Sequence, residues 1–258
     1  MSSREAVWNP APEHLRLGND EVHVWRASLN QPTATIAVFK QILAPDELAR
    51  AARFHFQKDR DHFIVARALL RIILGRYLGI LPEQLRFCFN DYGKPALAVA
   101  EDSETVRFNL SHSRELVLIA FARNRELGID LEYVRDDSDT AQIAKQFFSP
   151  REVEALGALP PGLRAEGFFR CWTRKEAYIK ARGQGLSLPL DQFDVSLAPD
   201  EPAELLSVAS DPEEVSRWSL RELAPGNGYL AAIAVEGSGW QLNCFQWPDV
   251  KSPEGATV

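Results

Sequence analysis

Two carboxylates stand close together in the short stretch of residues 128–132, which reads Gly-Ile-Asp-Leu-Glu. On a β-strand alternate residues share a face, so Asp130 and Glu132 would point the same way while Ile129 and Leu131 face the core. Neighbouring carboxylates repel each other unless a cation lies between them, and oxygen ligands that act together with phosphate suit Mg²⁺. The alternative interpretation is a strand with a solvated acidic face, because exposed carboxylates are common.

A second cluster occupies residues 172–180, which read Trp-Thr-Arg-Lys-Glu-Ala-Tyr-Ile-Lys. Trp172, Glu176 and Lys180 are four residues apart, a spacing that predicts one face of a helix. Glu176 could supply a third metal oxygen or accept a proton, and Lys180 could hold a phosphate oxygen. The alternative is an ordinary glutamate–lysine pair on an exposed helix.

A third cluster, Asn-Leu-Ser-His-Ser at residues 109–113, is expected where a strand over 106–110 leads into a turn at 111–113. Hydroxyls and an imidazole in a turn can bind phosphate, although Ser and Asn are also ordinary turn residues. A Ser-His-Asp hydrolase is excluded because Ser111 and His112 are adjacent and no Gly-x-Ser-x-Gly elbow occurs.

Three further groups allow both a functional and a structural interpretation. The Tyr-Gly-Lys-Pro sequence at 92–95 predicts a turn that could aim Lys94 at an anion. The Ser-Pro-Arg-Glu sequence at 149–152 matches a capping box, so Glu152 could be purely structural. His62 lies in a basic group that could face a phosphate or simply be solvated, with neighbours Lys58, Arg60 and Arg67.

These residues need helices and strands to position them, and the pattern of apolar residues predicts both. We expect helices from Pro45, over about 59–78 with Gly79 as its cap, over 140–148 and from 149. A further long helix is expected over about 163–182, stopped by Gly183 and Gly185. Strands are expected at 21–28, 85–89, 106–110, 116–122, 127–132, 193–197, 216–222, 229–235 and 241–245. Each half therefore contains helices followed by a small antiparallel sheet, with a ligand cleft expected between the halves.

The predicted divisions of the chain are a lead-in over 1–20, an N-terminal lobe over 21–135, a C-terminal lobe over 136–246 and a flexible tail over 247–258. The net charge of −7 argues against a general nucleic-acid binder, which needs a basic surface. The three cysteines lie far apart, with neither a zinc spacing nor a disulfide framework, which favours a reduced cytosolic compartment. No secretory signal or membrane-spanning run is visible.

The order of the clusters resembles the paired signature of the 4′-phosphopantetheinyl transferase superfamily, in which residues like 128–132 precede residues like 172–180 by about 40 positions. Further blocks at 92–95, 108–113, 147–149 with Glu152, and 185–190 are similar to that family as well. The set resembles the large, two-lobed type that activates peptide synthetases such as surfactin synthetase. The resemblance covers roughly residues 45–197.

The resemblance implies a monomeric α+β fold of two pseudo-twofold-related lobes, each with a small, mainly antiparallel sheet packed on helices, and coenzyme A in the cleft between them. It implies a cytoplasmic, Mg²⁺-dependent enzyme that transfers 4′-phosphopantetheine from coenzyme A to a serine of an apo acyl or peptidyl carrier protein. By position, the family's metal ligands fall on Asp130, Glu132 and Glu176. Its coenzyme A contacts fall on Lys94, Pro95, Ser111, His112 and Lys180, and its catalytic roles on Glu176, Lys180, His112 and Glu152.

The upstream contacts to the 3′-phosphate depart from the family's pattern. The aligned positions hold Glu47, Arg50 and His62, of which only Arg50 is clearly basic. We expect Arg50, Arg60 and His62 to contribute to this part of the site, with Arg53, Lys58 or Arg67 as possible substitutes. Two alternatives to the transferase stay open: a metal-dependent nucleotide phosphohydrolase and a non-catalytic binding relative of the same fold.

Overall fold

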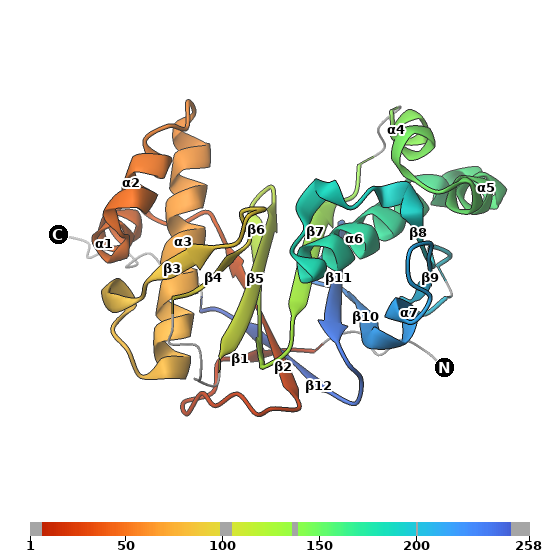
Figure 1. Cartoon of the computed structure of the whole chain (residues 1–258). Coiled ribbons are helices and arrows are strands. Elements are labelled where there is room, and N and C mark those ends of the chain that lie inside the picture. The colour runs from red at the N-terminus through yellow and green to blue at the C-terminus, as the bar shows by residue number, and fades with distance from the viewer. Residues whose placement is uncertain (1–6, 99–104, 136–138, 200, 249–258) are drawn as a thin grey trace.

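The computed structural model describes residues 7–98, 105–135, 139–199 and 201–248, and it shows an α+β protein with two lobes (Figure 1). Its helices are α1 (Thr33–Ile42), α2 (Pro45–Ala51), α3 (Gln57–Leu78), α4 (Thr140–Phe147), α5 (Pro150–Ala158), α6 (Arg164–Arg182) and α7 (Glu214–Arg217). Its strands are β1 (Trp8–Pro10), β2 (Glu21–Ser28), β3 (Phe87–Phe89), β4 (Pro95–Leu97), β5 (Val106–Ser113), β6 (Leu116–Arg123), β7 (Leu127–Tyr133), β8 (Phe193–Val195), β9 (Leu205–Val208), β10 (Trp218–Leu223), β11 (Tyr229–Glu236) and β12 (Gln241–Gln246).

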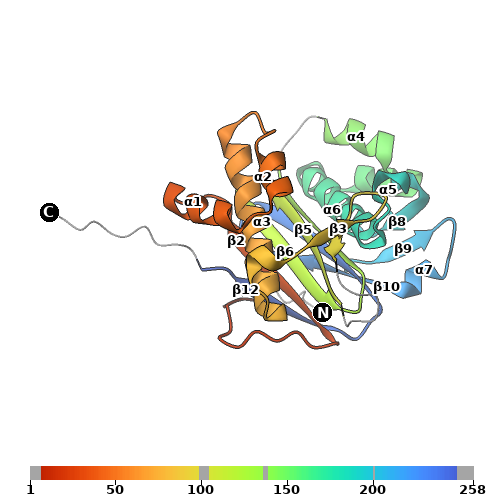
Figure 2. The same ribbon diagram turned by 60° about the vertical axis from the view of Figure 1, so that its left-hand side comes forward.

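Two sheets form the centre of the molecule. The larger has the strand order β1-β12-β2-β6-β5 and the smaller has the order β10-β11-β7, while β3-β4 and β8-β9 form small two-stranded sheets. Strand β12 pairs in parallel with both β1 and β2, and the other pairs are antiparallel. Helices α1–α3 lie on one side of the sheets and α4–α6 on the other (Figures 1 and 2).

The two large sheets meet at their edge strands β5 and β7, which lie next to each other in the middle of the molecule (Figure 1). Apolar side chains form three clusters around this centre. Helix α3 packs on the larger sheet, α6 packs on the smaller sheet, and a third cluster lies between the two sheets. Val24 of β2 and Leu118 of β6 share this third cluster with Ile129 of β7. The lobes therefore share a hydrophobic core.

Several sequence predictions are confirmed at the level of single elements. Strand β2 occupies residues 21–28 as expected, and Gly79 and Gly183 end α3 and α6 with φ of 66° and 69°. The Ser149 hydroxyl accepts from the Glu152 backbone N–H at the start of α5, and the Glu152 carboxylate accepts from the Ser149 backbone N–H. The predicted capping box is therefore present.

The three cysteines are free thiols. Within the described residues, no helix is both long enough and apolar enough to cross a bilayer.

The predicted turn at residues 111–113 is wrong, because β5 continues through Ser113 and pairs there with Leu116. The chain reverses at Arg114, whose φ of 49° is the left-handed conformation of a tight hairpin turn. Helix α1 is absent from the predicted elements. It has no side-chain cap, and it buries Ile36 and Phe39 in the core that is built around α3, so tertiary contacts define it.

The sheets cross the predicted lobe boundary near residue 136. Strand β7, placed by the sequence in the N-terminal lobe, pairs with β11, and β12, placed in the C-terminal lobe, pairs with β2. The division into lobes therefore stays a proposal. The start of the predicted lead-in (1–6) and most of the predicted tail (249–258) lie outside the described residues.

Candidate active site

A pocket of about 480 Å³ opens where β5, β7 and α6 meet. Its lining includes the three carboxylates of Asp130, Glu132 and Glu176, and the Lys180 side chain. It is completed by Leu110, Ser111, His112 and Trp172. Residues from three separate sequence clusters, 109–113, 128–132 and 172–180, thus come together in one place. Trp172, Glu176 and Lys180 share a helix face, as their spacing predicts.

Strand alternation and a close helix contact place these groups. Ile129 and Leu131 are buried in the core between the sheets, so Asp130 and Glu132 face α6. At Gly128 the helix lies directly on the strand, because an added Cβ would collide with the carbonyl oxygen of Ala177 and the backbone nitrogen of Ala181. Because Gly128 has no side chain, α6 can approach β7 closely enough to bring Lys180 next to Asp130.

The centre of the pocket is an ion pair. Lys180 Nζ lies 2.6 Å from Asp130 Oδ1, and it also donates to Ser111 Oγ (3.2 Å) and to the Ile129 carbonyl (3.3 Å). Burial, reinforced by the charge of Asp130, raises the pKa of both Glu132 and Glu176. The three carboxylates therefore lie close enough to repel one another, and they favour a compensating cation.

The donor set fits a hard divalent cation. Asp130 is 4% exposed, and its Oδ2 atom is buried with no hydrogen-bond partner among the described residues. A buried carboxylate oxygen without a partner is costly, and a metal ligand position would satisfy it. In the part of the chain that the structure describes, no three acidic, histidine or cysteine side chains are already arranged as a cation site. Side-chain movement would have to draw the carboxylates together.

A second hollow, of about 280 Å³, adjoins the first at Leu110 and His112. It lies between α2, α3 and β5, and Arg50 and Arg67 supply positive charge to it, while Phe63, Phe89 and Pro95 supply apolar surface. Arg67 is paired with Glu47, whereas Arg50 has no ion-pair partner among the described residues and lies over the Phe63 ring. Charge and flat apolar surface together suit a phosphorylated nucleotide.

His112 lies at the junction of the two hollows. Partial desolvation of the ring between the two hollows, together with the nearby charge of Lys180, lowers the pKa of His112, which favours the neutral imidazole. A neutral imidazole can donate one hydrogen bond and accept another. Ser111 points to the opposite side of β5 and is buried, whereas His112 is exposed, as strand alternation requires.

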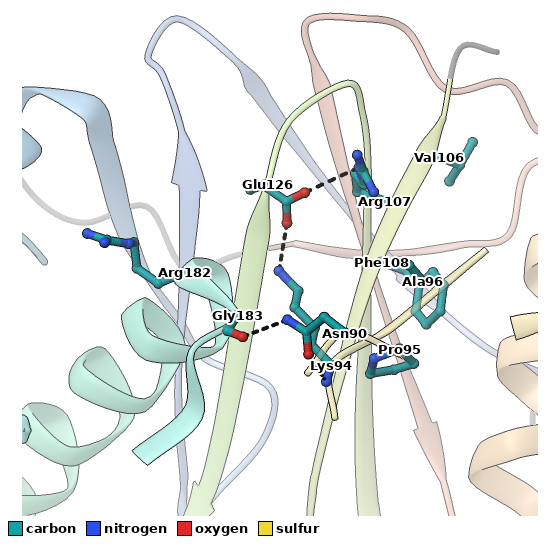
Figure 3. A pocket seen from close by; sticks show the side chains of 10 residues that line it. All are labelled: Asn90, Lys94, Pro95, Ala96, Val106, Arg107, Phe108, Glu126, Arg182 and Gly183. Atoms are coloured by element: carbon teal, nitrogen blue, oxygen red, sulfur yellow. Dashed lines mark hydrogen bonds and ion pairs between the residues drawn. The ribbon is translucent and has the colours of Figure 1, made fainter. Parts of the chain in front are cut away.

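Lys94 does not face the second hollow. Its ammonium lies 2.7 Å from Glu126 Oε2 and donates to the carbonyls of Leu127 (3.2 Å) and Ala181 (2.9 Å), beside Asn90, which donates to the Gly183 carbonyl (Figure 3). These contacts tie the β3–β4 turn to the C-terminal end of α6, where a cation is favourable. The three acceptors use all three ammonium protons of Lys94, so the predicted contact between Lys94 and coenzyme A would require at least one of these bonds to break.

Three other predicted site residues lie outside both hollows. Arg60 donates to the Phe54 carbonyl and to Gln57, and His62 bonds Asn30. Glu152 is 2% exposed, and its oxygens accept from Lys175, from the cap backbone of Ser149 and from the Val195 backbone. The structure therefore favours the capping interpretation of Glu152 over a catalytic one, because no oxygen is free to reach a substrate.

Sequence reasoning missed or undervalued some residues of this region. Arg67 was only a substitute for the predicted basic residues, yet it lines the second hollow. Ser113 was assigned to a turn, yet its hydroxyl donates to Glu132 Oε2 (3.1 Å). Extending the strand by its alternation from Ser111 would have placed Ser113 on the same face.

Two family models match the chain in sequence order. One, described as 4′-phosphopantetheinyl transferase, N-terminal, matches residues 23–124. The other, described as 4′-phosphopantetheinyl transferase superfamily, matches residues 126–234. The boundary between the two matches falls in the short connection between β6 and β7, immediately before the strand that carries Asp130 and Glu132.

Individual proteins are similar over most of the chain. The 4′-phosphopantetheinyl transferase HetI of Nostoc sp. is 45% identical over 91% of this chain and 96% of its own length. A protein of Synechocystis sp. named putative 4′-phosphopantetheinyl transferase slr0495 is 34% identical over 87% of this chain and 95% of its own length. The 4′-phosphopantetheinyl transferase Sfp of Bacillus subtilis is 34% identical over 63% of this chain and 70% of its own length.

Proposed function

Since the chain belongs to the 4′-phosphopantetheinyl transferase superfamily, we propose that it transfers the 4′-phosphopantetheine group of coenzyme A to a serine of an apo acyl or peptidyl carrier protein. One observation supports this most strongly: three carboxylates and a lysine, from a strand and a helix far apart in sequence, line one pocket. That arrangement argues against the alternative of a non-catalytic binding protein of the same fold, which would not need to keep these four polar side chains together.

Asp130, Glu132 and Glu176 would hold Mg²⁺ together with the diphosphate of coenzyme A. The metal would supply charge stabilisation at the phosphoryl group when bound. Lys180 and His112 lie on the same pocket and can donate hydrogen bonds to phosphate oxygens. Arg50 and Arg67, across the adjoining hollow, would hold the remaining phosphate of the nucleotide end.

In the reaction, the carrier serine hydroxyl attacks the phosphorus that bears the pantetheine arm, and adenosine 3′,5′-bisphosphate leaves. The serine proton passes to a carboxylate. Glu176 suits this role because its carboxylate lines the same pocket as Lys180 and His112. We do not assign this role to Glu152, because it is buried and paired with Lys175. We propose a monomeric, cytoplasmic enzyme, the compartment in keeping with its free thiols.

The decisive experiment incubates the protein with coenzyme A and Mg²⁺, with and without an apo carrier protein, and follows adenosine bisphosphate and carrier mass. We expect bisphosphate release only with the carrier, accompanied by carrier mass gain. Release without a carrier would instead identify a phosphohydrolase. A panel of fatty-acid, polyketide and peptide-synthetase carriers in the same assay would identify the preferred partner.

A further inference from the structure

The seam between β5 and β7 is bridged by side chains. Alternate β7 backbone N–H groups donate to alternate β5 side chains: Ile129 to Asn109 Oδ1 (2.9 Å), Leu131 to Ser111 Oγ (3.3 Å) and Tyr133 to Ser113 Oγ (3.1 Å). We name Asn109, Ser111 and Ser113 the seam ladder. A direct backbone ladder would set the strands about 4.8 Å apart, so the inserted side chains hold this edge wider.

Two rungs of the seam ladder carry a second bond. The Ser111 hydroxyl donates to Asp130 Oδ1 at 2.9 Å, and the Ser113 hydroxyl donates to Glu132 Oε2 at 3.1 Å. Each serine thus accepts from the β7 backbone and donates to the carboxylate one position earlier. The Asn109 rung has no such contact, because the corresponding earlier residue is Gly128.

The hydrogen-bonding capacity of Ser111 is fully used. A hydroxyl has one proton and two acceptor positions. Here the proton goes to Asp130, and the acceptor positions receive the Leu131 N–H and Lys180 Nζ. The predicted contact between Ser111 and a coenzyme A phosphate would have to displace one of these bonds. The geometry makes Ser111 a support for the carboxylate instead.

We propose that Ser111 and Ser113 are positioning residues. Ser111 orients the carboxylate of Asp130 toward the metal, and Ser113 orients the carboxylate of Glu132. This rests on the proposed function, because it presumes the Mg²⁺ site. Two carboxylates on one strand face repel each other, so each needs a fixed donor to keep its orientation. Each serine holds one oxygen and leaves the other oxygen of the same carboxylate for the cation. Such supporting bonds typically contribute 10–100-fold in metal affinity.

The test measures Mn²⁺ binding by electron paramagnetic resonance in the presence of coenzyme A, with no turnover. Ser113→Ala should weaken Mn²⁺ binding by about tenfold or more, while the KM for coenzyme A changes little. Asn109→Ala is the matched control, since it removes a rung that touches no carboxylate, and Mn²⁺ affinity should stay near that of the wild type. Ser113→Thr should restore binding, and Ser113→Val, of the same shape without a hydroxyl, should not.

The outcomes separate the two proposals. If the wild-type protein binds no Mn²⁺, the proposed metal site is wrong and the positioning role is lost with it. If the wild type binds but Ser113→Ala and Ser113→Val bind equally well, the positioning role alone is wrong. Equal weakening in Asn109→Ala and Ser113→Ala, with parallel losses of melting temperature, would reduce the seam ladder to a structural role. The Thr and Val pair keeps the test valid even where the Ala variant folds poorly.

Discussion

Two buried carboxylate–lysine pairs show how surroundings separate a reactive residue from a structural one. Glu152 and Lys175 are 2.7 Å apart, both are fully buried, and Glu152 also accepts from the backbone N–H groups of Ser149 and Val195. Asp130 and Lys180 are 2.6 Å apart, but Lys180 reaches the pocket surface and Asp130 Oδ2 has no hydrogen-bond partner among the described residues. Unused hydrogen-bonding capacity next to a pocket makes the second pair the candidate for function.

Glu152→Gln should therefore destabilise the protein rather than its chemistry. The variant leaves the Lys175 ammonium buried without a counter-charge, a change that typically costs about 3–5 kcal/mol. We expect the free energy of unfolding in urea to fall by that order, while the folded fraction keeps its kcat. A stable protein with severely reduced kcat would return Glu152 to the list of catalytic residues.

Glu176→Gln should give the opposite pattern. The amide can neither accept the serine proton nor act as an anionic metal ligand, so kcat should fall by at least about 100-fold. Removing a mutually repelling carboxylate should leave the melting temperature unchanged or slightly raised. Carrier modification followed by mass spectrometry measures the first quantity and thermal unfolding the second. Near-normal transfer would exclude Glu176 from the site.

His23 gives the protein a pH-dependent stability. It is buried beside Tyr77, and burial lowers its pKa despite the opposing charge of Glu21. Below about pH 6.5 the unfolded chain binds a proton that the folded chain resists, so this residue's contribution to stability decreases as pH falls through that range. The carboxylates with raised pKa act in the opposite direction, so the informative quantity is a difference between variants.

We expect the unfolding free energy of wild type minus that of His23→Gln to decrease between pH 7 and pH 5, because Gln retains a hydrogen bond to Tyr77 but does not titrate. Urea unfolding at a series of pH values measures this difference. A difference that stays constant across the range would show that His23 titrates alike in both states.

At the scale of elements, the site depends on how closely α6 lies on the smaller sheet. Gly128, Ala232 and Ala234 line the contact, and the first has no room for a side chain. The helix carries Glu176 and Lys180, whereas β7 carries Asp130 and Glu132. Any separation of helix and strand therefore pulls the carboxylate group apart.

Gly128→Ala should lower both stability and transfer. The added methyl meets backbone atoms that cannot rotate away, and overpacking of this kind costs about 1–3 kcal/mol or more. Gly157→Ala is the control: Gly157 is an exposed residue of α5 with nothing near its Cβ position, so the variant should be more stable by about 0.5–1 kcal/mol. Thermal unfolding and carrier modification compare the two. Full activity in Gly128→Ala would contradict the close contact.

At the scale of the whole molecule, β12, the last strand of the described residues, lies in the same sheet as β1, the first. Strand β12 lies between β1 and β2, and the cluster between the sheets includes Trp240 and Cys244 from this end of the chain. The second of the two family models ends before this strand, at residue 234. The lobes are thus joined by a shared core and by β12, which follows the C-terminal lobe in the sequence but pairs with β2 of the N-terminal lobe.

A chain that ends at Gly239 should fail to fold stably, because it leaves an edge of β2 unpaired and uncovers the core between the sheets. A chain that ends at Pro248 keeps every described contact of β12 and should melt close to the full chain. Circular dichroism and thermal unfolding distinguish the two. If the shorter chain melted normally, β12 would be dispensable for the fold.

The sequence by itself determined most of the local structure and the candidates for the reacting groups. Strand alternation at residues 128–132 and the four-residue spacing from Trp172 to Lys180 predicted which faces carry the polar groups, and Gly79, Gly183 and Ser149 marked helix ends. These signals are local, since each depends on neighbours within a few residues, and such neighbours are fixed by backbone geometry.

Only the tertiary structure decided what each polar group contacts. Lys94 and Glu152 have the residue types of ligand-binding and catalytic groups, yet their bonds are occupied, most of them by partners distant in the sequence. Ser113, assigned to a turn, reaches Glu132 because two separate sheets meet edge to edge. Whether a donor or acceptor is free is a property of long-range packing, which no local spacing contains.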